Sequence, residues 1–133
     1  MKLLGIDYGA KRVGIALSDD GGSIAFAKAV LSSGPELLGE IGKLCDSEKV
    51  EGVVIGESKN FAQEENSIMK DVHKLKAKIE ETTKLPVYFE PELMTSMEAQ
   101  HIQGQNNMND ASAAAIILQS FINRKMNNPQ ETI

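Results

Sequence analysis

The sequence predicts an α/β domain built on a mixed five-stranded sheet, with three antiparallel strands followed by two parallel ones and helices on both faces. Near the N-terminus, two apolar runs are separated only by a short glycine-containing turn, which favours an antiparallel hairpin. Farther along, β-branched runs alternate with segments whose apolar residues recur at helical spacing, a pattern typical of parallel strands joined by helices. The 133 residues suit one domain, and no linker or internal repeat divides them.

The first three strands are expected in the N-terminal part of the chain. Residues 2–7 form an apolar strand, and residues 12–18 form a second one after the turn at 8–11. The run DDGG at 19–22 is rich in turn residues, so the chain reverses again there. Residues 23–31 extend as a third strand, although their alanines give a weaker β signal.

A helix and a buried strand are expected next. Ser33 and Glu36 match a capping box, and Pro35 suits an early helical position because its missing N–H is not needed there. Apolar residues at helical spacing then continue to Cys45. The run VEGVVIG at 50–56 is apolar and rich in β-branched residues, which favours a buried parallel strand.

The remaining chain completes the alternation of helices and strands. Residues 57–65 are polar and irregular, and residues 66–83 form a second helix with one apolar stripe. Residues 86–90 (PVYFE) form the fifth strand. We expect a short helix at 95–103 and a final one at 110–125.

The order of these elements predicts where a site would lie. Right-handed crossovers place the fourth and fifth strands on the far side of the first strand, so the first strand is central. Its carboxyl end opens toward the ends of those two strands, where ligands of α/β sheets gather. We expect residues 1–126 to form this single domain and residues 127–133 to form a flexible polar tail.

Composition and charge narrow the class of protein. The hydrophobic fraction of 41% and the charged fraction of 25% are those of a globular protein. The net charge of −5 weighs against binding of nucleic acid by bulk charge alone. No apolar run approaches the roughly 20 residues of a membrane helix, and no secretory signal is present, so no membrane partner is expected. The single cysteine, Cys45, fits a reducing compartment and predicts a cytoplasmic protein.

Three acidic residues stand where acids are unusual or where strand ends meet. Asp7 ends the apolar central strand, and a buried carboxylate without a partner costs several kcal/mol, which favours a partner or a metal ion. Its alternative interpretation is an aspartate that caps the adjacent turn. Glu92 follows the fifth strand, and its alternative interpretation is a solvated loop acid. Asp110 begins the last helix, where capping alone would explain an aspartate.

Together these acids favour a metal site. The predicted topology brings Asp7, Glu92 and Asp110 to one edge of the sheet, and clustered carboxylates repel one another unless a cation holds them. Ligands that offer only oxygen atoms prefer Mg²⁺ or Mn²⁺. Two such ions can activate a water molecule and stabilise the leaving oxygen of a phosphodiester. Glu57 follows the fourth strand directly and is either a fourth ligand or a loop acid.

Basic residues near this edge suit phosphate binding. Gly9 lets the backbone approach a phosphate closely, and Lys11 and Arg12 supply positive charge. Lysines also recur at positions 70, 74 and 78 of the second long helix, opposite its apolar stripe. They are either a contact to a phosphate backbone or a solvated helix face.

Three segments resemble the motifs of the YqgF/RuvX family. Residues 4–19 (LGIDYGAKRVGIALSD) are similar to the family's opening motif, residues 92–99 (ELMTSMEA) to a variant of its second, and residues 110–119 (DASAAAIILQ) to its third. The order and spacing are also those of the family. The resemblance implies an RNase H-like fold, shared with RuvC-type Holliday junction resolvases. It also implies a metal-dependent nuclease that trims the 5′ end of pre-16S ribosomal RNA, with Asp7, Glu92 and Asp110 as its acids.

Two segments depart from the family pattern. The family's Gly-Leu-Pro after the fourth strand, and the Asp-Gly beyond it, are replaced by GESKNF at 56–61. Its Asp-Glu-Arg is replaced by Pro91-Glu92-Leu93, so an acid and an arginine are missing. These changes call into question how well the chain binds its substrate. Glu57 would compensate if it acts like the acid that RuvC-type enzymes carry at the end of their fourth strand.

The leading hypothesis is therefore a nuclease that processes pre-rRNA, as a monomer or a homodimer. A resolvase of branched DNA is the second hypothesis, and it requires a dimer because two symmetric strands are cut. A non-catalytic protein that binds rRNA or assembling ribosomes is the third, favoured by the acidic pI of 5.0 and the altered second motif. A sugar kinase or actin-like ATPase shares an Asp-x-Gly turn, but it needs two lobes and therefore more than 133 residues.

Overall fold

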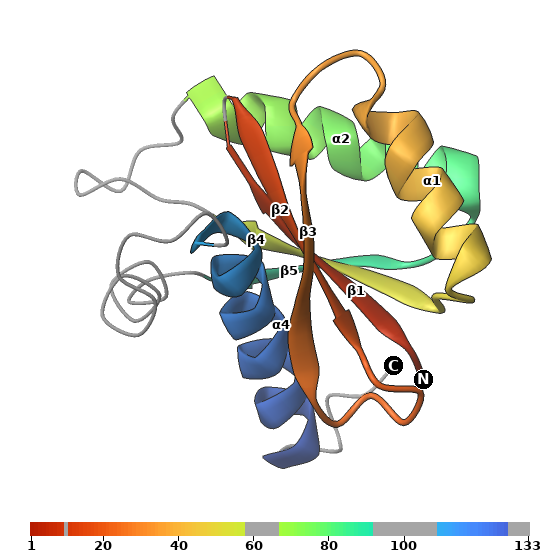
Figure 1. Cartoon of the computed structure of the whole chain (residues 1–133), viewed down its shortest axis with the longest axis vertical. Coiled ribbons are helices and arrows are strands. Elements are labelled where there is room, and N and C mark those ends of the chain that lie inside the picture. Colours follow the sequence, from red (N-terminus) through yellow and green to blue (C-terminus); the bar gives the residue numbers. More distant parts are fainter. Residues whose placement is uncertain (10, 58–66, 92–108, 128–133) are drawn as a thin grey trace.

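The computed structural model describes residues 1–9, 11–57, 67–91 and 109–127 (Figure 1). Five strands and three helices occur in this part of the chain. In chain order they are β1 (Leu3–Tyr8), β2 (Arg12–Ser18), β3 (Ala25–Ser32), α1 (Leu37–Ser47), β4 (Gly52–Glu57), α2 (Ser67–Thr83), β5 (Val87–Pro91) and α4 (Asn109–Asn127). The short helix predicted at 95–103, most of the irregular segment at 57–65 and nearly all of the predicted tail lie outside the described residues.

The strands form one sheet in the order β3-β2-β1-β4-β5. β1 is antiparallel to β2 and parallel to β4, and β5 continues the parallel half of the sheet. The predicted mixed sheet with a central first strand is confirmed. The order follows from the short hairpins that join the first three strands and from the helices that carry the chain across to β4 and β5.

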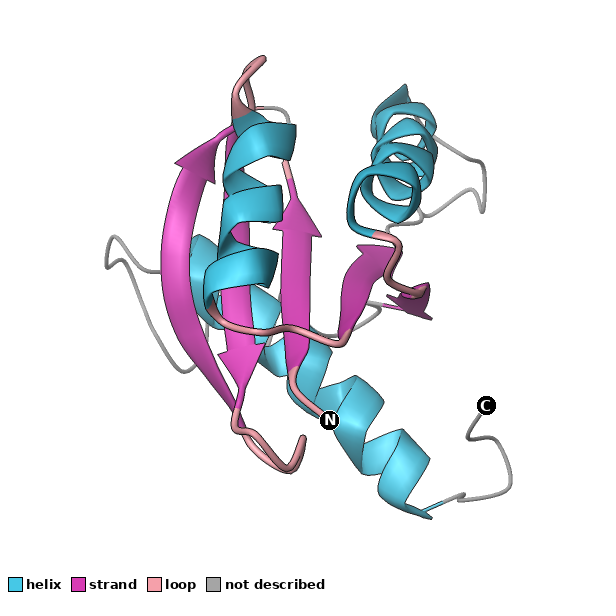
Figure 2. Ribbon diagram, turned by 90° about the vertical axis from the view of Figure 1, so that its right-hand side faces the viewer, coloured by secondary structure: helices cyan, strands magenta, loops and turns pink. Residues whose placement is uncertain are grey.

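Helices cover both faces of the sheet, and successive residues of β1 point to opposite faces. Leu4 and Ile6 pack in a core cluster with residues of α1 and α2, such as Ile41 and Ile79. Leu3 packs in a second cluster with residues of α4. Figure 2 shows α1 in front of the sheet and α4 crossing behind it. None of the described helices has the length and apolar character needed to cross a membrane.

α4 approaches β1 closely because the contact consists of small residues. A Cβ atom on Gly5 would lie 2.9 Å from Leu118 Cβ and 3.1 Å from the carbonyl oxygen of Ala114. Ala111 and Ala114 of α4 are fully buried. The alanine-rich start of α4 therefore lies directly against the sheet.

The predicted capping box at the start of α1 is wrong. The helix begins at Leu37, its N-cap is Glu36, and no side chain caps it. The Ser33 hydroxyl instead donates a hydrogen bond to the Tyr8 hydroxyl at 3.1 Å. The Ser33 amide donates to the carbonyl of Lys11 at 3.0 Å, so tertiary contacts to the β1–β2 turn hold Ser33 one turn before the helix.

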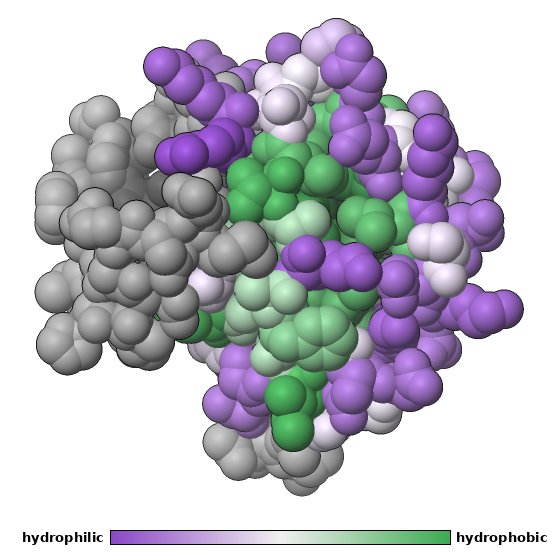
Figure 3. All heavy atoms as spheres, viewed as in Figure 1, coloured by the Kyte–Doolittle hydropathy of each residue, from purple (hydrophilic) through white to green (hydrophobic). Residues whose placement is uncertain are grey.

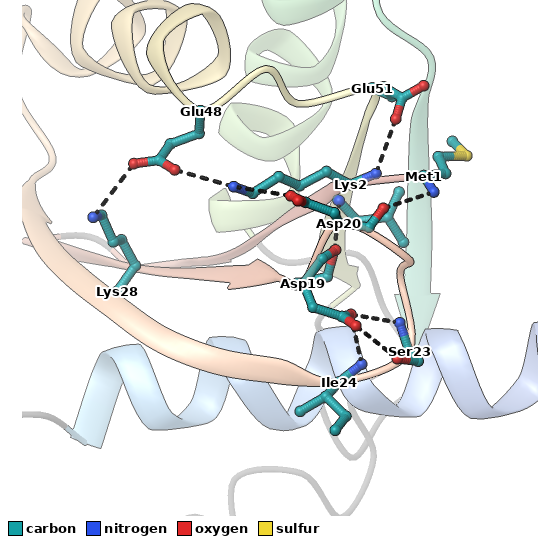
Figure 4. A network of polar contacts seen from close by, with 11 residues as sticks. Met1, Lys2, Asp19, Asp20, Ser23, Ile24, Lys28, Glu48 and Glu51 are labelled. Atoms are coloured by element: carbon teal, nitrogen blue, oxygen red, sulfur yellow. Dashed lines mark hydrogen bonds and ion pairs between the residues drawn. The ribbon is translucent and has the colours of Figure 1, made fainter.

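Polar contacts join the other end of the sheet, where β1 begins (Figure 4). Lys2 Nζ lies 3.1 Å from Glu48 Oε1 and 3.7 Å from Asp20 Oδ1, and Lys28 Nζ lies 3.5 Å from Glu48 Oε2. The Lys2 amide donates to Glu51 Oε1 at 3.1 Å. These contacts connect the start of β1 to the β2–β3 turn and to the end of α1.

The outer strand β3 carries exposed apolar side chains. Phe26 on this strand is 47% exposed, and Ile24, which directly precedes the strand, is 63% exposed. Figure 3 shows hydrophobic residues gathered on this face of the molecule, with hydrophilic residues around and between them. Lys28 follows Phe26 by two residues on the same strand, and a charge of this kind blunts an exposed strand edge against pairing with another chain.

Candidate active site

Asp7 lies near the carboxyl end of β1, the central strand. It pairs with Gly14 of β2 and is half-buried. Strand alternation places it on the same face as Leu3 and Gly5, which is the face covered by α4. The carboxylate therefore sits where the strand emerges from the core and not at the core's centre.

The direction of α4 brings its first turn toward this end of β1. Gln119 Oε1 accepts a hydrogen bond from the Ala25 amide at 2.8 Å, and Ala25 pairs with Ser18 at the end of β2. The Ser18 hydroxyl accepts from the Leu3 amide at 2.8 Å, so the later part of α4 lies level with the start of β1. α4 thus runs opposite to β1, as Figure 1 also shows.

Asp7 and position 110 lie at similar distances from the point where β1 contacts α4. From the contact between Gly5 and Ala114, Asp7 lies two residues farther along β1, about 6.6 Å in an extended strand. Asp110 lies four residues earlier in α4, about 6 Å along the helix axis. The backbone thus places Asp7 and position 110 at the same end and on the same face of the sheet.

Glu57 reaches the same edge on the opposite face. It is the last residue of β4, and it shares its parity with Val53 and Ile55, which pack in the cluster with α1 and α2. Val54, one residue out of phase, packs with α4. Alternation therefore directs Glu57 away from the face that carries Asp7.

Glu92 follows Pro91, the last residue of β5, and lies outside the described residues. The preceding acid, Glu90, is 4% exposed and faces α4. Its carboxylate accepts hydrogen bonds from the Ser120 hydroxyl at 2.9 Å and from Arg124 Nη2 at 2.7 Å. The contact of Glu90 with Ser120 and Arg124 was not predicted from the sequence. The available signal was the spacing of Ser120 and Arg124, four residues apart on one side of the last helix.

The β1–β2 turn holds the predicted phosphate-binding residues next to Asp7. A Cβ atom on Gly9 would lie 2.6 Å from the carbonyl oxygen of Arg12, so the turn requires glycine at this position. Lys11 and Arg12 are both exposed. This turn therefore presents two cationic side chains at the end of the sheet where Asp7 lies.

The three acids predicted as metal ligands suit a hard divalent cation. Asp7, Glu92 and Asp110 offer only carboxylate oxygens, which Mg²⁺ and Mn²⁺ prefer. Two softer donors in the described part of the chain lie elsewhere. The His73 ring packs edge-on against Phe89, and Cys45 is buried in the core, where burial raises the pKa of its thiol to about 11. Among the described residues alone, no three histidine, cysteine or acidic side chains gather as a metal site, and Glu92 is not among them.

Comparison with known proteins decides the family. The sequence profile of the RuvX family, described as Holliday junction resolvase, matches residues 1–124. The chain belongs to the RuvX family. The recognised resemblance is therefore confirmed, and the match spans β1 through most of α4.

Relatives in the RuvX family match along nearly their whole length. A protein of Oleidesulfovibrio alaskensis named "Putative pre-16S rRNA nuclease" is 34% identical, with 92% of each chain covered. A protein of Oenococcus oeni with the same name is 30% identical, covering 94% of this chain and 96% of the relative.

Solved structures confirm the fold. The structure of Thermus thermophilus RuvC in complex with a Holliday junction substrate has a TM-score of 0.63 at 18% identity, covering 95% of this chain and 96% of RuvC. The fowlpox virus Holliday junction resolvase has a TM-score of 0.59 at 11% identity, covering 93% of this chain and 99% of the resolvase. The predicted RNase H-like architecture, shared with RuvC-type resolvases, is confirmed.

Proposed function

We propose that this RuvX-family protein is a metal-dependent nuclease that hydrolyses phosphodiester bonds in the 5′-end processing of pre-16S rRNA. The observation that supports it best is the placement of Asp7 at the end of the central strand, on the same face and at the same end as the first turn of α4. The names of the relatives support the substrate. The proposal places the activity in the cytoplasm, with the protein acting as a monomer or homodimer.

The chemistry assigns a role to each group. Asp7, Glu92 and Asp110 would hold Mg²⁺ or Mn²⁺, which supplies an activated water and neutralises charge on the phosphate. Lys11 and Arg12 hold the substrate phosphate by charge, and Gly9 lets the backbone come close to it. Glu90 anchors the end of β5 to α4 through Ser120 and Arg124, which fixes the strand from which Glu92 follows.

A cleavage assay tests this proposal. Precursor 16S rRNA and a four-way DNA junction are incubated side by side with wild type and Asp7→Asn, at one salt concentration, with and without Mg²⁺ or Mn²⁺. We expect metal-dependent cutting of the RNA and a loss of about 100-fold or more in Asp7→Asn, because asparagine keeps the shape but removes the charge. Equal cutting by both proteins would contradict the proposal. RNA binding with no cutting under any metal would favour the non-catalytic binder.

A resolvase of branched DNA is the second candidate, favoured by the family description and by the shared fold of RuvC. Its substrate has two symmetric strands, so the active form would be a dimer. Cutting of the junction in preference to the RNA, by a protein that elutes as a dimer on a sizing column, would support it. A monomer that cuts only RNA would exclude it.

A further inference from the structure

A depression of about 350 Å³ lies between the loop joining β3 to α1 and the outer side of α2. We call it the rim groove. Its polar lining consists of the Tyr8 and Ser33 hydroxyls, the Lys74 and Lys78 side chains and one acid, Asp71. Leucines of α1 and α2 form its apolar floor. The groove belongs neither to the carboxylate site nor to the β1–β2 turn already described.

The rim groove adjoins the candidate active site. Tyr8 directly follows Asp7 in β1, and its side chain packs on the opposite face, against the cluster of α1 and α2. The Ser33 amide is hydrogen-bonded to the carbonyl of Lys11, so one wall of the groove is joined to the β1–β2 turn. A strand bound at Asp7 would reach the groove, which lies on the opposite face of the sheet, by crossing the β1–β2 turn at Lys11.

The lysines of α2 are arranged to meet negative charge. Lys70, Lys74 and Lys78 are exposed and lie four residues apart, so their charges repel along one side of the helix. Lys76, on another side, is paired with Glu80 at 3.0 Å. No ion pair to Lys74 or Lys78 occurs in the described part of the chain, although Asp71 lies on the same helix. Solvent and salt screen this repulsion in part, and a ligand with several negative charges would relieve it further.

The hydroxyls add donors of the kind that phosphate oxygens accept. Ser33 Oγ donates to Tyr8 Oη at 3.1 Å, which leaves the phenol hydrogen of Tyr8 to donate elsewhere. One donor hydroxyl and two ammonium groups thus line one depression. Glu36 Oε2 would lie 3.5 Å from a Cβ atom on Gly34, which lines the groove, so its negative charge disfavours an anion there and favours the part near Lys74 and Lys78.

We propose that the rim groove binds backbone phosphates of the nucleic-acid strand that leads away from the active site, through Lys74, Lys78 and the Tyr8 hydroxyl. The proposal rests on the proposed nuclease function and adds the path of its substrate. It also gives a protein of net charge −5 a local set of cations for a polyanion, because Lys74 and Lys78 line the groove and Lys11 lies in the adjoining turn.

Binding without cleavage tests the groove separately from the chemistry. A fluorescein-labelled single-stranded RNA is titrated in EDTA at several salt concentrations, and fluorescence anisotropy reports its affinity. Lys74→Gln/Lys78→Gln is compared with Lys43→Gln/Lys49→Gln, which removes the same charge from the far end of α1. We expect the groove variant to bind about tenfold or more weakly, with a salt slope lower by about 1.4, for two lost phosphate contacts. The control should match wild type.

The outcomes separate the two proposals. The rim groove is overturned if both variants bind RNA equally weakly, or if the groove variant binds as wild type does. Equal melting temperatures of the three proteins check that the variants are folded. Wild-type binding in EDTA that depends on Lys74 and Lys78 supports the groove even if no metal restores cutting, a result that would refute only the nuclease. Absence of RNA binding by wild type in EDTA overturns the rim groove alone, because the proposed nuclease requires a metal ion and is tested by the cleavage assay. If cutting occurs, the groove variant should raise KM and leave kcat unchanged.

Discussion

Three hydrogen bonds to the Asp19 carboxylate determine which protonation state this residue favours. Its carboxylate accepts bonds from the Ile24 amide at 3.0 Å, from the Ser23 amide at 2.7 Å and from the Ser23 hydroxyl at 2.8 Å (Figure 4). These bonds favour the ionised form and lower the pKa of Asp19 from 3.8 to about 2. The β2–β3 turn therefore depends on a negative charge at this position.

This lowered pKa predicts a loss of stability in acid. The folded state has the lower pKa, so the contribution of Asp19 is fully present above pH 3.8 and is lost as pH falls toward 2. Asp19→Asn should lower the melting temperature at pH 7, and its difference from wild type should shrink between pH 4 and pH 2. Asp20→Asn is the control, because the Asp20 side chain is 97% exposed. The same pH trend in both variants would contradict this account.

Individual residues also show the limits of prediction from sequence. Ser33 and Glu36 match a capping box, but the sequence could not reveal that the Tyr8 hydroxyl, 25 residues away, would engage Ser33. Glu90 binds Arg124, which lies 34 residues away, and the sequence does not show which acid this arginine contacts. The face of Glu57 could not be predicted from the sequence, because Val53, Val54 and Ile55 are all buried and both faces of β4 are therefore apolar.

At the level of elements, the sequence predicted most of the fold because short-range signals govern it. The turn after β1 contains Gly9, the turn after β2 is rich in glycine and aspartate, and the apolar stripe of α2 has helical spacing, so these elements lie within a residue or two of their predicted bounds. The small alanines of α4 are a sequence signal that this helix can pack closely on a strand. The requirement for glycine at position 5 was not, because it depends on Leu118 and Ala114.

The close contact of α4 with β1 predicts that Gly5→Ala destabilises the protein. The added methyl group would meet Leu118 Cβ and the Ala114 carbonyl, and neither moves without shifting the helix. We expect a loss of about 1–3 kcal/mol in the free energy of unfolding, measured by urea denaturation.

Gly39→Ala in α1 is the matched control for this substitution. A Cβ atom there meets nothing within 4 Å, so the variant should gain up to about 1 kcal/mol from helix propensity. An unchanged stability of Gly5→Ala would mean that α4 does not lie as close to β1 as described.

For the whole molecule, the fold gathers residues that are distant in the chain. β1 carries Asp7 and the start of α4 carries position 110, whereas Glu92 follows β5 and lies outside the described residues. One end of the sheet thus combines Asp7 and the first turn of α4 with a turn that carries Lys11 and Arg12, and the Ser33 wall of the rim groove is joined to that turn. Polar contacts around Lys2 and Glu48 join the opposite end.

The central claim is that Asp7, Glu92 and Asp110 share a divalent cation. Mn²⁺ titration followed by electron paramagnetic resonance measures this without any substrate. We expect wild type to bind Mn²⁺, and Asp7→Asn, Glu92→Gln and Asp110→Asn each to weaken binding about 10-fold or more. Glu57→Gln, an acid at the same sheet edge on the opposite face, should bind as wild type does. Undiminished Mn²⁺ binding by Asp7→Asn, or loss of binding in Glu57→Gln alone, would contradict the account.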